Sequence, residues 1–247
     1  MTRTAQSGRS SRSELPPPLP PETRTVGQLV AEAVRFYGSR FWPSLALGIP
    51  PAILAVAFAP LDRIERLLLL VTAGAVLVTA SYVAACALVA GRRPGSLRLA
   101  FTTGVLVFAP VPALATAFVL PALAWLAFLG LAVPAVLLEE RGFRAAFRRG
   151  IELARADYVH ALGSLATLVI VVFLCQGVLF FVLRGAGEAA IAVAGFLANL
   201  VISPVLFLGS ALLYYDQAAR VRSSKRDGAL PRGKPAPPGP VRHPSSR

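Results

Sequence analysis

The sequence has few charged residues, and one long segment has none. Only 15% of its 247 residues are Asp, Glu, Lys or Arg, whereas a soluble domain carries roughly 25%. No charged residue occurs from Leu99 to Leu138. A helix needs about 20 predominantly apolar residues to cross a bilayer, so this segment is long enough for two crossings. The composition therefore argues against an ordinary soluble enzyme and predicts a protein built in a membrane.

Residues that commonly form catalytic and metal sites are also scarce. The sequence has two histidines, His160 and His243, and two cysteines, Cys86 and Cys175, which have no metal-binding spacing. It contains no Ser-His-Asp set and no phosphate-binding glycine loop. Asp and Glu are absent from every apolar segment, which argues against an ion-coupled transporter. We therefore expect a non-enzymatic protein with no cofactor and no metal.

Six charge-poor windows predict an all-α membrane protein, a six-transmembrane helical bundle over residues 25–217. The third and fourth spans share the uncharged segment. A turn at Pro110–Pro112 would leave the first arm too short to cross, so we place the turn near Phe118–Pro121. The exact position of that turn stays open, as does the depth of residues 99–103. The predicted spans are approximately 43–61, 67–90, 99–118, 121–138, 161–183 and 189–215.

Positive charge gathers on one side of this predicted topology. Every Lys and Arg except Arg63, Arg66 and Arg184 lies on the side of the N-terminus. The positive-inside rule then predicts a multi-pass protein of the cell membrane with both termini cytoplasmic. The net charge of +13 lies in the tails and in segments flanking the spans. That placement favours anionic lipid headgroups, and not nucleic acid, as its partner.

Two tails and a first amphipathic segment flank the predicted spans. Residues 1–24 are rich in Pro, Ser and Arg, and residues 218–247 are basic and rich in Pro and Gly, so we expect both to be disordered. Thr25–Arg40 has apolar residues at helical spacing and opens with a capping box, Thr25 and Gln28. We expect this segment to be a helix on the cytoplasmic surface.

A second cytoplasmic interfacial helix is predicted from Glu139 to Tyr158. Its arginines either meet anionic headgroups, at about 1 kcal/mol each, or form a solvated face anchored by phenylalanines. The sequence leaves both interpretations open. The apolar face holds Phe143, Phe147, Ile151 and Ala154, and the polar face holds Arg141, Arg144, Arg148, Glu152 and Arg155.

Three groups of residues together resemble a known family. They are Thr25-Val26-Gly27-Gln28-Leu29 leading to Phe36-Tyr37, Ala132-Val133-Pro134-Ala135-Val136-Leu137-Leu138-Glu139 followed by Gly142 and 145–150, and Ser210-Ala211-Leu212-Leu213-Tyr214-Tyr215-Asp216. Residues 25–222 are similar to bacterial, actinobacterial-type integral membrane proteins related to the membrane domain of glycerophosphoryl diester phosphodiesterases, whose function is largely unknown. The resemblance does not imply phosphodiesterase activity, which belongs to a separate soluble barrel.

The polar residues of these motifs are predicted to lie at one depth on the cytoplasmic face. Pro134 kinks the fourth span near its end, so Glu139 reaches the interface, where the sixth span also ends. We expect this cluster to lock the second interfacial helix against the bundle, with a ligand site as the alternative. The candidate residues are Pro134, Glu139, Arg149, Tyr214, Tyr215 and Asp216.

Gln176 and Asn199 are the polar residues within the spans that we select as candidates for a pathway. Polar residues in membrane helices usually bond neighbouring helices.

Two functions remain. The first is a protein that organises lipid or a partner, and this partner is another membrane protein or a second copy of the chain. The second is a passive permease or channel component. A continuous polar cavity lined by Gln176 and Asn199 would favour transport. A bundle closed by Leu, Val and Ala, with basic surface helices, would favour organisation. An intramembrane enzyme has the least support.

Overall fold

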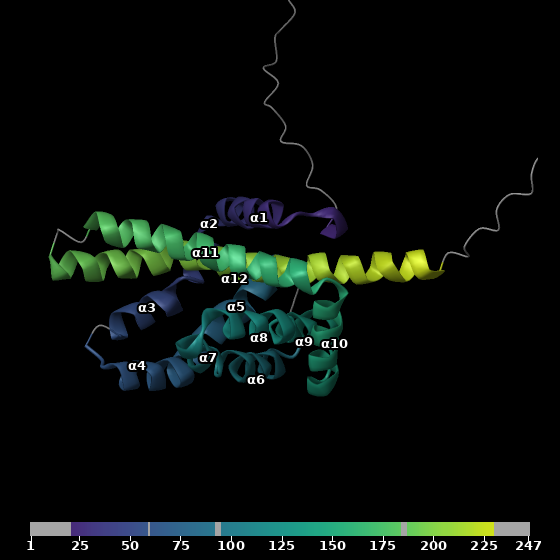
Figure 1. Cartoon of the computed structure of the whole chain (residues 1–247), viewed down its shortest axis with the longest axis horizontal. Helices are drawn as coiled ribbons and strands as arrows, with labels where there is room; N and C mark the ends of the chain where they lie inside the picture. The colour runs from purple at the N-terminus through teal and green to yellow at the C-terminus, as the bar shows by residue number, and fades with distance from the viewer. Residues whose placement is uncertain (1–20, 59, 92–94, 184–186, 230–247) are drawn as a thin grey trace, which may run out of the picture.

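A computed structural model describes residues 21–58, 60–91, 95–183 and 187–229. Within these ranges all regular structure is helical (Figure 1). Five helices are long and apolar enough to cross a membrane: Arg63–Ala90, Leu97–Ala117, Val119–Glu139, Tyr158–Leu183 and Ala189–Lys225. A sixth is obtained if the bent pair Val26–Ser39 and Phe41–Ala57 forms one span. The prediction of an all-α, multi-span membrane protein is confirmed at this level.

Breaks in the helical backbone divide these spans into shorter helices. Counted along the described chain they are η1 (Pro21–Thr23), α1 (Val26–Ser39), α2 (Phe41–Ala46), α3 (Ile49–Ala57), α4 (Arg63–Leu69), the π-helical η2 (Leu70–Gly74), α5 (Ala75–Ala90), α6 (Leu97–Phe108), α7 (Val111–Ala117), α8 (Val119–Leu129), α9 (Ala132–Glu139), α10 (Phe143–Ala156), α11 (Tyr158–Leu183) and α12 (Glu188–Ala229).

The long helix α12 organises the bundle. It packs along α11, and it also contacts α1, α3, α5 and α10. Figure 1 shows α1 and α3–α9 on opposite sides of the α11–α12 pair, and α10 lying across the long axis of the molecule. We call the end that carries α10 the α10 end. The core is closed by leucine, valine and alanine; its fully buried members include Leu137, Leu153, Leu168 and Leu208.

The N-terminal helix begins as the sequence predicts, and the chain changes direction at its end. Thr25 Oγ1 accepts from the backbone of Gln28, whose side chain accepts from the Thr25 backbone at 2.7 Å, so the capping box is confirmed. The chain then bends by 109° between α1 and Phe41–Ala57. Gly48 and the prolines that follow it divide that second part into α2 and α3.

The turn in the uncharged segment falls at Phe118, within the predicted range. Phe118 is extended, with φ −160° and ψ 147°, and it separates α7 from α8. A second break precedes α7 at Pro110, where the ring removes the backbone donor that a continuous helix needs. The helices α7 and α8 therefore pack against each other as a helical hairpin.

Three predicted boundaries are wrong. Residues 218–229 were expected to be disordered, but α12 continues to Ala229 because Ala218 and Val221 are buried with the core. The predicted helix from Glu139 to Tyr158 is interrupted, because Glu140 adopts a left-handed conformation with φ 52° and α10 begins only at Phe143. Residues 21–24 are ordered, and the remaining tail residues, 1–20 and 230–247, lie outside the described ranges.

The close approach of α3 to α12 generates a stability prediction. A Cβ atom at Gly48 would lie 1.9 Å from the carbonyl oxygen of Leu200. Backbone cannot yield as a flexible side chain does, so Gly48→Ala should lower the free energy of unfolding by about 1–3 kcal/mol. The control is Gly177→Ala, whose Cβ meets nothing within 4 Å. Thermal unfolding in detergent measures both; equal midpoints for the two variants would contradict the close packing.

Candidate functional site

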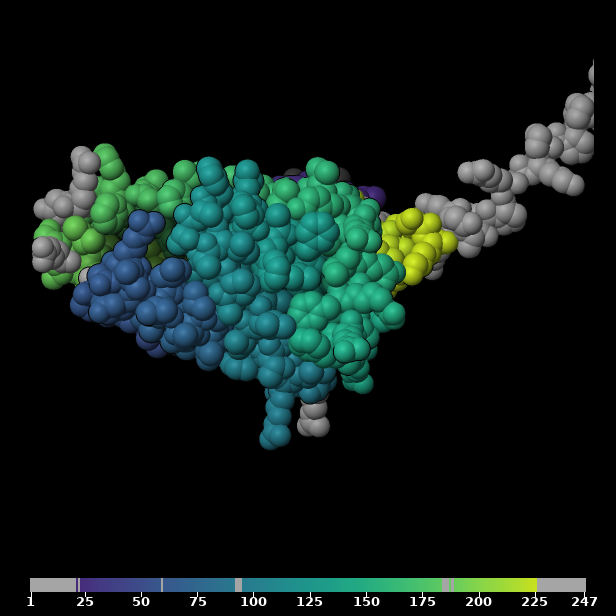
Figure 2. Space-filling view, turned by 60° about the horizontal axis from the view of Figure 1, so that its bottom comes forward, coloured from purple at the N-terminus to yellow at the C-terminus, as the bar shows by residue number. Residues whose placement is uncertain are grey.

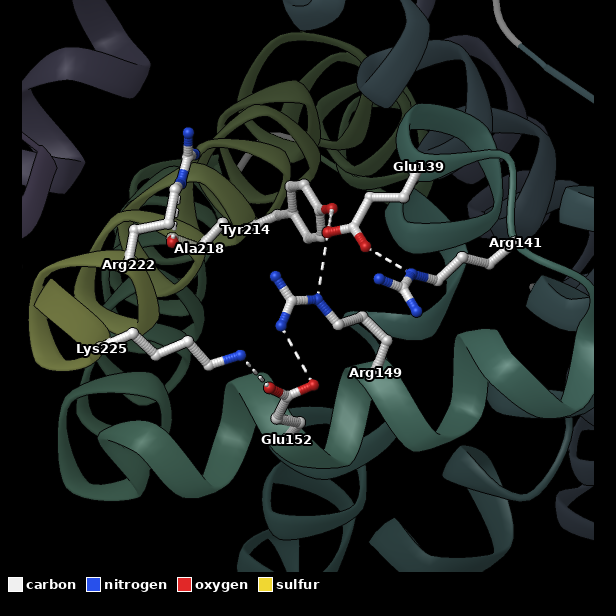
Figure 3. Close-up of polar contacts among 8 residues, drawn as sticks. All are labelled: Glu139, Arg141, Arg149, Glu152, Tyr214, Ala218, Arg222 and Lys225. Atoms are coloured by element: carbon white, nitrogen blue, oxygen red, sulfur yellow. Dashed lines mark hydrogen bonds and ion pairs between the residues drawn. The ribbon is translucent and has the colours of Figure 1, made fainter. Parts of the chain in front are cut away.

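Three of the predicted site residues meet at the α10 end of the bundle (Figure 3). Glu139 ends α9, Arg149 lies on α10 and Tyr214 lies on α12. The Tyr214 hydroxyl donates to Glu139 Oε1 at 2.6 Å, and Arg149 Nε donates to the same oxygen at 3.1 Å. Arg141 Nε donates to the other oxygen, Oε2. One carboxylate therefore joins three helices and the turn between α9 and α10.

A second carboxylate ties α10 to α12 on the same side. Glu152 accepts from Lys225 Nζ at 3.1 Å and from Arg149 at 3.1 Å (Figure 3). The hydrogen bonds from Lys225 and then Arg149 hold the pKa of the Glu152 carboxyl below its ordinary value. The ion pairs of Glu152 therefore contribute their full stabilisation above the ordinary pKa of a glutamate. That stabilisation is lost as the pH falls through the lowered pKa of the Glu152 carboxyl. The Lys225 and Glu152 side chains are both exposed, so the stabilisation from their ion pair is small.

Asp216 does not join the Glu139 carboxylate as expected, but forms its ion pair elsewhere. It lies two residues after Tyr214, and a helix with 3.6 residues per turn directs such residues to nearly opposite sides. Its Oδ1 lies 2.7 Å from a guanidinium nitrogen of Arg24, with side-chain exposures of 0% and 10%. Arg24 was assigned to a disordered tail, and this contact fixes it against α12.

Arg24 belongs to a second polar cluster, which the sequence interpretation missed. Arg220 donates to Asp157 Oδ2 at 2.9 Å and to the Arg24 carbonyl at 2.9 Å. Gln217 donates to the Asp157 carbonyl at 3.3 Å. The spacing of Asp216 and Arg220, one helical turn apart, is a signal that could have placed these two on one face. No local signal pointed to Arg24. We call Arg24, Asp157, Asp216, Gln217 and Arg220 the Asp216 cluster.

The other two candidate residues have packing roles. Pro134 is buried in the first turn of α9, where a helix does not need its backbone donor. The interruption of the span, at Gly130 and Leu131, lies one turn before Pro134, whose ring has no N–H for the carbonyl four residues earlier. That carbonyl, of Gly130, accepts from the Tyr82 hydroxyl at 3.3 Å, so the break lies where a kink caused by Pro134 is expected. The ring of Tyr215 packs edge-on against Tyr214 with centroids 5.7 Å apart.

The two pathway candidates bond to each other. Gln176 Nε2 donates to Asn199 Oδ1 at 3.3 Å, which links α11 to α12. Asn199 also donates to the Gly195 carbonyl at 2.9 Å. Both residues line a hollow of about 170 Å³ together with Phe180. Their amides are thus engaged in a bond between helices, the usual use of such residues.

A separate hollow of about 300 Å³ lies among α5, α8, α11 and α12. Its lining is apolar except for Tyr82 and Ser210, and the Tyr82 hydroxyl donates to the Gly130 carbonyl at 3.3 Å. It shares no lining residue with the hollow at Gln176 and Asn199. These two hollows therefore do not form one continuous polar passage.

Ion pairs and hydrogen bonds join the side chains of both polar clusters. Within the described ranges, no group of three or more His, Cys, Asp or Glu side chains is placed to hold a metal ion. Comparison of the chain with protein-family models, curated proteins and solved structures found no match.

The bond between Tyr214 and Glu139 can be tested with a double-mutant cycle. Tyr214→Phe should lower the free energy of unfolding by about 1.5–3 kcal/mol, because a hydrogen bond to a charged acceptor is lost. In a Glu139→Gln background the same substitution should cost less, since the charged acceptor is already gone. Denaturation in detergent measures all four proteins, and strictly additive losses would contradict a direct bond.

The Asp216 cluster makes a second, independent prediction. Arg24→Ala leaves a buried carboxylate without its ion pair, so it should cost about 3–5 kcal/mol. Adding Asp216→Asn should recover part of that loss, because the uncompensated charge is removed. Arg222→Ala is the control, since Arg222 donates only to the Ala218 carbonyl of its own helix. Thermal unfolding compares these variants; a mild Arg24→Ala phenotype would show that the pair does not form.

Proposed function

We propose that this chain is a non-enzymatic, multi-pass protein of the cell membrane that gathers anionic lipid at its cytoplasmic face. The single observation that carries the proposal is a stripe of three arginines on α10. Arg144, Arg148 and Arg155 are all exposed. Their spacing is close to one and then two helical turns, so they share one side of the helix. We call these three residues the α10 arginine stripe.

The stripe differs from the other basic groups around it. Arg149 and Arg220 are engaged by carboxylates at 3.1 Å and 2.9 Å. None of the three stripe residues forms an ion pair with another described residue. The opposite side of α10 is buried against the bundle through Ala146 and Leu153. The helix is thus fixed by one face and presents free positive charge on the other.

The position of α10 supports lipid as the ligand. It lies across the bundle where the spans end (Figure 1), and the distribution of Lys and Arg favours the cytoplasm on that side. Phe143, at the start of α10, is 39% exposed. A basic helix with exposed aromatic residues matches an interface of headgroups and acyl chains.

A passive permease or channel component is the alternative function. It requires a polar passage, and the described residues around Gln176 and Asn199 form a bonded pair beside a small hollow. The apolar closure of the core favours the organising function.

Lipid binding by the stripe can be measured directly. The variant Arg144→Gln/Arg148→Gln/Arg155→Gln should bind phosphatidylglycerol about a hundredfold more weakly, since each arginine contributes about 1 kcal/mol. Native mass spectrometry of the purified protein counts bound phosphatidylglycerol against phosphatidylcholine. Arg63→Gln, at the opposite end of the bundle, is the matched control.

Two results would overturn the proposal. One is equal retention of phosphatidylglycerol by the wild type and the triple variant. The other is specific solute uptake by proteoliposomes that contain the wild type, which would favour the permease.

A further inference from the structure

A groove on the outer surface connects α8 to the α10 arginine stripe. It has a volume of about 390 Å³. Pro121, Trp125 and Phe128 line it at helical spacing along one side of α8. At one end lies Leu114 of α7, and at the other lie Ile151 and Arg155 of α10. Figure 2 shows the face on which α8 (teal) and α10 (green) lie side by side.

The walls of the groove are held in place by bonds outside it. The indole Nε1 of Trp125 donates to the Val107 carbonyl of α6 at 2.8 Å. The Phe128 ring stacks on Tyr158 of α11, with centroids 4.6 Å apart and planes 26° from parallel. The two largest lining side chains are thus fixed before any ligand arrives, which lowers the entropic cost of binding.

The groove is apolar along its length and charged at one end. Arg155 is its only charged lining residue, is exposed, and forms no ion pair with any described residue. The opposite end lies at the α7–α8 turn, where α8 begins. A ligand that fits must therefore be an amphiphile with one apolar chain and an anionic head.

The groove is long enough for part of one acyl chain. Its lining residues on α8 run from Pro121 to Leu129, which is about 12 Å of helix at 1.5 Å per residue. One leaflet of the hydrocarbon core is about 15 Å thick, so a chain from a single leaflet is sufficient to fill the groove.

We propose that this groove holds one acyl chain of an anionic phospholipid of the cytoplasmic leaflet, with the lipid phosphate against Arg155. The inference rests on the proposed function, because it places a lipid at the α10 end, and it adds the site and the part of the lipid that is bound. Arg144 and Arg148 then attract anionic lipid to the surface, while Arg155 orients the molecule that occupies the groove.

Trp125 provides an internal probe for this site. The sequence has two tryptophans, Trp42 and Trp125, so Trp42→Phe leaves only the groove residue fluorescent. The Trp42→Phe protein is reconstituted in phosphatidylcholine vesicles containing a fixed fraction of phosphatidylglycerol, with bromine on the acyl chains of either lipid. We expect brominated phosphatidylglycerol to quench Trp125 with a relative association constant about fivefold above that of brominated phosphatidylcholine.

Three further variants separate the groove from the surface charge. Arg155→Gln should abolish the fivefold preference at Trp125, whereas Arg63→Gln should retain it. Ala124→Phe, which places a ring in the groove, should reduce quenching by both lipids. Since a filled groove can impair folding, Arg155→Gln, an exposed substitution, gives the decisive comparison.

The outcomes distinguish this inference from the proposed function. Equal quenching by the two lipids in the Trp42→Phe protein overturns the groove site, and so does a preference that survives Arg155→Gln. If phosphatidylglycerol still binds the wild type and is lost in the triple arginine variant, the proposed function stands without the groove. If neither assay shows a preference for phosphatidylglycerol, both proposals fail.

Discussion

The carboxylate of Glu139 determines where α10 lies, and the features of the α10 end follow from that position. It is the last residue of α9, and it accepts from Tyr214 of α12 and from Arg149 of α10. Each donor comes from a different helix, so the bond network fixes the angle at which α10 leaves the bundle. The left-handed Glu140 makes that change of direction possible within a short turn. Without it, α9 would continue along the bundle and α10 would not lie across its end.

Charged groups at this end fall into two kinds. Those that face the bundle are paired: Asp216 with Arg24, Asp157 with Arg220, and Glu139 with Arg149. Burying a charge without a partner is costly, so these pairs are required wherever the helices meet. The exposed side of α10 is under no such constraint, and the α10 arginine stripe forms no ion pair with another described residue. The separation of paired from unpaired charge is the physical basis for proposing a lipid-binding face there.

The sequence predicts features that depend on neighbouring residues better than those that depend on distant ones. The capping box of Thr25 and the break at Phe118 are local, and both occur as expected. The partner of Asp216 is Arg24, which lies near the other end of the chain in a segment that reads as a tail. No local pattern encodes such a contact. The extension of α12 beyond residue 217 was also missed. The segment is basic and was therefore interpreted as a tail, although its apolar residues Ala218 and Val221 lie at helical spacing and are buried.

The length of α12 places contacts from very different levels of the bundle on one element. Its 42 residues extend about 63 Å at 1.5 Å per residue, about twice the thickness of the hydrocarbon core. The helix supplies Asn199, which bonds α11, and also Tyr214 and Asp216, which bond the residues at the α10 end. A shift of α12 along its axis would therefore disturb all of these contacts together.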